Sequence, residues 1–99
     1  MIVFQRTGLI AGGKQGDAIA FAHRIADVFK DVTGVGIDVM IPIGGNPFQV
    51  TWRGHCDSLA AMDDAQSKTM ANQKYLETVA AGVGLFIEGT FEDEIWRTV

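Results

Sequence analysis

The segment that decides the fold is GIDVMIPIGGNPFQVTWRGHCDSL, residues 36–59. Apolar and polar residues alternate on both sides of Gly-Gly-Asn-Pro, residues 44–47, as in two half-buried strands joined by a turn. With residues 44–47 as the loop, antiparallel pairing sets Ile43 opposite Phe48 and Asp38 opposite Arg53. This register gathers the apolar residues on one face, whereas a slip of one residue would mix the faces. We therefore predict a β-hairpin with an Asp38–Arg53 ion pair on its second face, worth ~0.2 to 1 kcal/mol if exposed.

Turn geometry explains the glycines better than nucleotide binding does. Gly and Asn tolerate positive φ in a loop, and no helix follows residues 44–47 to supply the backbone amides of a phosphate site. The other Gly-rich stretch, Gly12 to Lys14, departs from the P-loop pattern because Gln15 stands where Ser or Thr is required. We interpret both stretches as turns.

The adjacent His55 and Cys56 do not make a nucleophilic pair. Neighbouring residues on a strand point to opposite faces, so the imidazole and the thiol cannot meet. The other histidine, His23, falls on the polar side of a helical pattern, and Cys56 is interpreted as a small, partly buried apolar residue. Two histidines and one cysteine do not form a zinc ligand set, so no metal and no cofactor are predicted.

The sequence around the hairpin supplies two further strands and the helices. Residues 2–10 are rich in β-branched and aromatic residues, which predicts a strand, and residues 15–32 carry an apolar stripe at helical spacing that stops at Gly34. Asp57 or Ser58 can cap a second helix, and Asn72 can cap a further turn or two that Gly82 ends. A last strand covers roughly residues 91–98. Four residues of the segment after Asn72 are expected to face inward: Tyr75, Leu76, Val79 and Ala80.

The order β-α-β-β-α-β predicts one α+β domain over residues 1–99. It is typical of the ferredoxin-like fold, a four-stranded antiparallel sheet with the helices on one face. The other face of the sheet then needs water or a partner.

The charge and the cysteine content of the sequence limit the kinds of molecule that the protein is expected to bind. The net charge is −4 and the eight Lys and Arg are scattered, so neither nucleic acid nor an anionic membrane surface is an expected partner. One cysteine cannot form an internal disulfide, and no apolar run approaches the ~18 residues of a membrane span. We expect a reduced, cytoplasmic, soluble protein.

Three stretches resemble the NIPSNAP-like members of the dimeric α/β-barrel superfamily, which also includes antibiotic-biosynthesis monooxygenases. They are RTGLIAGGK at residues 6–14, Trp52 followed by DSLAAM at residues 57–62, and KYLETVAAGVGLFIEGTFEDEIWR at residues 74–97. The resemblance covers most of the chain. It implies a homodimer in which two sheets close into a barrel with the helices outside.

The resemblance also implies that the free sheet face lines a lumen. Arg53 and His55 would lie there, together with ligand contacts from Gln49, Thr51 and Met40, and either Trp52 or Trp96 would supply an aromatic wall. Strand one would add either Arg6 or the pair Gln5 and Thr7, because both of its faces mix apolar and polar residues.

Three functions follow as expectations. The first is a homodimeric barrel that binds a small, partly apolar or anionic molecule, with Arg53 and Arg6 contacting a carboxylate or phosphate. The second, by analogy within the superfamily, is a cofactor-independent monooxygenase or isomerase in which His55 is the general base and Arg53 stabilises an oxyanion. The third is a structural or interaction module whose barrel is filled by its own side chains.

Overall fold

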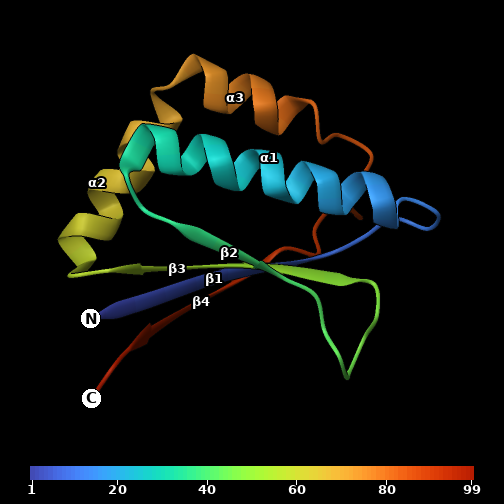
Figure 1. The fold of residues 1–99 in the computed structure, drawn as a ribbon, viewed down its shortest axis with the longest axis horizontal. Coiled ribbons are helices and arrows are strands. Elements are labelled where there is room, and N and C mark those ends of the chain that lie inside the picture. The colour runs from blue at the N-terminus through green and yellow to red at the C-terminus, as the bar shows by residue number, and fades with distance from the viewer.

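The chain folds into one antiparallel sheet with three helices on a single side of it. The structure, a computed structural model, describes residues 1–99 (Figure 1). The sheet has the order β2-β3-β1-β4, with every neighbouring pair antiparallel. This confirms the predicted α+β, ferredoxin-like architecture. The elements are β1 (Ile2–Leu9), α1 (Gln15–Thr33), β2 (Ile37–Met40), β3 (Gln49–Cys56), α2 (Leu59–Met70), α3 (Gln73–Ala80) and β4 (Glu92–Arg97).

The register of the central hairpin is the predicted one, but its loop is longer. Asp38 lies opposite Arg53 and Met40 opposite Thr51. The strands stop at Met40 and resume at Gln49, so the expected Ile43–Phe48 pair is wrong. Pro42 has no N–H to donate to the ladder, and the carbonyl of Phe48 instead accepts a hydrogen bond of 2.7 Å from the amide of Ile10.

Three of the helix ends lie at capping residues that the sequence predicted. Gly34 closes α1 in the left-handed conformation with φ 77°, as expected of a C-terminal glycine. Ser58 caps α2 by accepting a hydrogen bond from the amide of Ala61, and Asn72 caps α3 through the amide of Tyr75. The prediction that α3 faces inward is wrong for Leu76, Val79 and Ala80, because α3 covers α1 and leaves its own outer side in water.

The core lies between the sheet and α1. Val50 and Ala18 are fully buried there, and the indole Nε1 of Trp52 donates a hydrogen bond of 3.1 Å to the carbonyl of Ala22. Phe4 packs against Phe29 of α1, which places the even-numbered residues of β1 on the side of the helices. Trp52 therefore faces the helices, as its alternation predicted.

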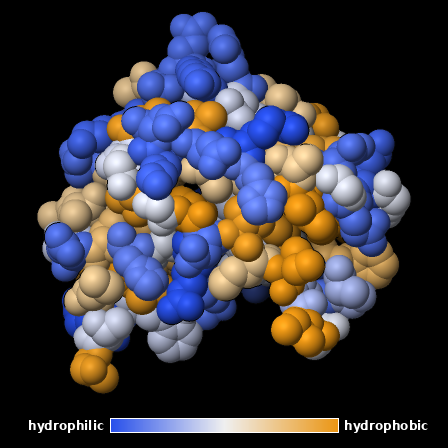
Figure 2. Space-filling view, in the orientation of Figure 1, coloured by the Kyte–Doolittle hydropathy of each residue, from blue (hydrophilic) through white to orange (hydrophobic).

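The opposite side of the sheet, here called the open face, carries no helix (Figure 1). The β2–β3 hairpin and the end of β4 both project below the sheet on this side, and between them the molecular surface is hollowed (Figure 2). A monomer of this mass is expected to expose about 5,500 Å², whereas the chain, with a mass of 10.7 kDa, exposes 6254 Å². The chain thus exposes more surface than an average monomer of its mass. None of its helices combines the length and the apolar character needed to cross a membrane.

Candidate functional site

The open face gathers most of the candidate residues from the sequence. Strand alternation sends side chains from all four strands to this side, because Trp52, Phe4 and Ile37 occupy the helix side. Its members are Val3, Gln5, Thr7, Asp38, Met40, Gln49, Thr51, Arg53, His55, Glu92, Glu94 and Trp96. The two candidate catalytic residues and four of the five candidate ligand contacts are therefore brought to one surface.

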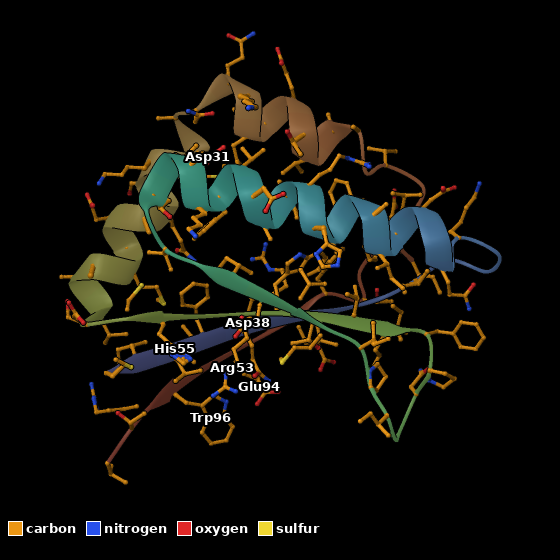
Figure 3. All side chains as sticks on the ribbon, viewed as in Figure 1. Asp31, Asp38, Arg53, His55, Glu94 and Trp96 are labelled. Carbon is orange, nitrogen blue, oxygen red and sulfur yellow. The ribbon has the colours of Figure 1, made fainter.

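A polar row crosses the middle of this face. The register places Asp38, Arg53, Gln5 and Glu94 side by side on four successive strands. Figure 3 shows the side chains of Arg53 and Glu94 below the sheet, away from the helices. The Nε of Arg53 is buried and has no hydrogen-bond acceptor. The half-buried guanidinium forms no ion pair within the chain, so its other N–H groups are available to donate to a ligand oxygen.

The expected Asp38–Arg53 ion pair is wrong, although the two residues are cross-strand neighbours. The ion pairs of the structure are Arg6–Asp93 and Lys68–Asp64, so Arg53 takes part in none. An exposed pair gains little from Coulomb attraction and must fix two flexible side chains. Arg53 consequently keeps its charge unneutralised by direct contact.

Two further rows flank the central one. On one side Val3 lies between His55 and Trp96, and the half-exposed indole of Trp96 donates a hydrogen bond of 3.2 Å to Oε2 of Glu94. On the other side the hydroxyls of Thr7 and Thr51 share a hydrogen bond of 2.7 Å. The open face therefore combines an aromatic wall, an imidazole, a guanidinium and hydroxyl groups.

Arg6 does not join this group. It lies on the helix side, where its Nε and Nη2 donate hydrogen bonds of 2.7 and 2.8 Å to the two carboxylate oxygens of Asp93. This contact raises the pKa of Arg6 and lowers the pKa of Asp93 from their ordinary values. The choice that the sequence left open for β1 is thus settled, since Gln5 and Thr7 face the same side as Arg53.

Two of the three acidic side chains of the open face, Glu92 and Glu94, were missed by sequence reasoning. Glu92 and Glu94 lie on β4, where the run Glu-Asp-Glu gives no alternation to assign a face. Only the pairing of β4 with β1, which sets Glu94 opposite Gln5, places them. Together with Asp38 they give the open face three carboxylates beside one guanidinium.

Cys56 and His23 lie outside this arrangement. Cys56 is buried, and desolvation, aided by the charge of Asp57, raises the pKa of its thiol above the ordinary value. His23 is exposed on α1, as its pattern predicted. No group of three or more His, Cys, Asp or Glu side chains is placed to hold a metal ion.

Comparisons with known proteins identify the fold. No protein-family model matches the sequence, and no curated protein sequence matches it either. Among solved structures, a NIPSNAP domain protein from Burkholderia xenovorans superposes with a TM-score of 0.85 at 14% identity, over 100% of this chain and 95% of that one. A NIPSNAP family protein from Agrobacterium tumefaciens, Atu5224, gives 0.83 at 19% identity, over 99% and 92% of the two chains.

A more distant structure extends the comparison. SnoaB, a cofactor-independent oxygenase from Streptomyces nogalater crystallised as a mutant, superposes with a TM-score of 0.70 at 14% identity, over 98% of this chain and 91% of that one. The chain therefore has the ferredoxin-like fold of NIPSNAP proteins and of antibiotic-biosynthesis monooxygenase-like proteins, as the sequence resemblance implied. At these identities the structural similarity shows the fold alone, and any function has to be argued from the residues of the site.

Proposed function

We propose that the protein is a homodimeric α/β barrel whose lumen, formed by two open faces, binds a small, partly apolar molecule with one oxygen acceptor group. The observation that carries the proposal is the partly exposed guanidinium of Arg53, which has no ion-pair partner and whose Nε lacks an acceptor, on a surface that no helix covers. A carboxylate or carbonyl oxygen of the ligand would accept from this group.

The charges of the open face refine the ligand class. Asp38 lies beside Arg53, and Glu94 lies beyond Gln5 in the same row, so both carboxylates would repel a phosphate carrying two negative charges. A monocarboxylate or a neutral carbonyl suits the row better. The indole of Trp96 and the side chain of Met40 supply apolar contacts on either side.

His55 extends the proposal towards chemistry. It lies two residues from Arg53 on the same strand and the same face, so an imidazole and a guanidinium could contact one bound molecule. The enzymatic alternative assigns proton abstraction to His55 and stabilisation of the resulting oxyanion to Arg53. Consumption of a bound quinone precursor or lactone would distinguish this alternative from simple binding.

A thermal-shift screen tests the proposal. Aromatic monocarboxylates, quinones, lactones and haemin are added to the protein at fixed concentration, and a ligand at 100 times its Kd should stabilise it by about 2.7 kcal/mol. The shift should vanish in Arg53→Ala and shrink in His55→Ala. Arg6→Ala is the matched control, because it removes a guanidinium from the other face of the sheet.

Three results would contradict the proposal. If binding is lost in Arg6→Ala and retained in Arg53→Ala, the site lies on the helix side. A protein that sediments as a monomer at micromolar concentration has no barrel lumen. If no compound shifts the melting temperature and both open-face variants melt like the wild type, the barrel is a structural module filled by its own side chains.

A further inference from the structure

The β2–β3 hairpin ends in an apolar tip that nothing in the chain covers. Ile41 is 60% exposed and Ile43 is fully exposed. The loop descends from the sheet on the side of the open face (Figure 1), and apolar surface gathers at this lower right corner of the molecule (Figure 2). Isolated apolar residues are common on surfaces, but two isoleucines on a projecting loop beside a hollowed face indicate a contact surface.

An apolar groove lies at the same end of the sheet. It has a volume of about 280 Å³ and includes Leu9, Ile10, Phe48 and Ile87 among its six lining residues. The backbone fixes its position, since the amide of Ile87 donates to the carbonyl of Leu9 at the end of β1. Phe48 and Ile87 are each nearly half exposed, so the groove is open to an incoming side chain.

In a two-fold dimer, the order of the strands brings the hairpin tip of one copy towards the groove of the other. β2 and β4 are the two edges of the sheet and run in opposite directions. A two-fold axis parallel to the strands, placed below the open face, sets β2 of one protomer antiparallel to β4 of its partner. β2 ends, and β4 begins, at the hairpin end of the molecule, so the tip of one protomer reaches the segment that precedes β4 in the other.

We propose that each hairpin tip packs Ile41 and Ile43 against a second copy, with Ile43 in the groove beside Ile87. This inference rests on the dimeric barrel of the proposed function. It names a contact at the seam of that barrel, which is the boundary where β2 of one protomer lies beside β4 of its partner. The surface of the chain supports a second copy as the occupant. Its excess over an average monomer, about 750 Å², is close to the ~800 Å² that each partner contributes to a standard interface.

Sedimentation equilibrium with charge variants tests the contact. In Ile43→Asp the dimer should dissociate roughly hundredfold more readily than in the wild type, because two apolar tips are lost per dimer. The fold should be unchanged by circular dichroism, since Ile43 is fully exposed within its own chain. Met70→Asp is the matched control, because Met70 is 67% exposed at the end of α2.

Cross-linking gives an independent readout. In a Cys56→Ala background, Ile43→Cys protein is mixed with Ile87→Cys protein and oxidised, and a disulfide-linked heterodimer should form. A mixture of Ile43→Cys with Met70→Cys should give none, and Ile43→Cys alone should give little, because the two-fold places the tips at opposite seams.

The outcomes separate this inference from the proposed function. A wild-type dimer that Ile43→Asp leaves intact, with no link between positions 43 and 87, overturns the hairpin contact and leaves the dimeric barrel standing. A wild-type monomer at micromolar concentration overturns the dimeric barrel itself, and the hairpin contact with it.

Discussion

Gly54 lies beneath two side chains of the sheet, Phe4 and Ile37, and its replacement should destabilise the fold. A Cβ atom built on Gly54 would lie 2.6 Å from the ring of Phe4 and 2.7 Å from Cδ1 of Ile37. Both distances are far below van der Waals contact, and the ring of Phe4 is itself held against Phe29 of α1. The methyl group of Gly54→Ala therefore cannot enter without displacing a packed ring.

The cost of this overpacking is about 1 to 3 kcal/mol. For a domain of this size each kcal/mol corresponds to about 4 to 8 °C in melting temperature, so Gly54→Ala should melt roughly 5 to 20 °C lower. Gly36→Ala is the matched control, because a Cβ there meets nothing within 4 Å. That substitution should leave the protein unchanged or stabilise it by ~0.4 to 1 kcal/mol through the unfolded state.

A double-mutant cycle identifies the cause. Phe4→Leu shortens the obstructing side chain, so the combined variant should lose less stability than the two single variants together, with a coupling of about 0.5 to 3 kcal/mol. Calorimetry at one protein concentration measures all four proteins. A Gly54→Ala protein within ~2 °C of the wild type, or strictly additive losses, would refute the packing argument.

Three more predictions concern single contacts. Asn72→Ala removes the cap of α3 and should cost ~1 kcal/mol in urea unfolding, whereas Asn72→Asp should keep most of the stability. Because Arg6 lowers the pKa of Asp93 in the folded chain, their contact stabilises the protein above the unfolded pKa of Asp93, near 3.9, and is lost as the pH falls through the lower folded pKa. Both side chains are about half exposed, so Asp93→Asn should cost less than ~1 kcal/mol at pH 7 and nothing near pH 2 in denaturant titrations, and an equal loss at both pH values would contradict this. Cys56 should react with a thiol reagent only on unfolding, and rapid labelling of the native protein would contradict its burial and raised pKa.

The strands and helices that could be predicted are those in which apolar and polar residues repeat with one clear period. Alternation in residues 37–40 and 49–55, together with the turn at residues 44–47, predicted the register, because a slip of one residue would place Val39 and Trp52 on opposite faces. The helix caps at Ser58 and Asn72 were equally predictable, since their side chains act on amides three residues away. At Ser58 and Asn72 the cap therefore depends only on residues that are near in the sequence.

The features that could not be predicted from the sequence depend on contacts between segments that are far apart in the chain. The face of Arg6 is decided by β4, which brings Asp93 beside it from the far end of the chain. The outer side of α3 was expected to be buried, because an apolar stripe does not reveal whether a sheet or only another helix lies against it. The unpaired state of Arg53 could not be predicted either, because the register places Asp38 opposite it without showing that the two side chains form no ion pair.

β4 is an edge strand that begins with three consecutive acidic residues, Glu92, Asp93 and Glu94. Two copies of such an edge repel each other, so β4 is a poor template for pairing with itself. The other edge, β2, is only four residues long and ends just before Ile41 and Pro42, which limits ladder growth there. The two edges thus disfavour the open-ended pairing of strands that builds fibres.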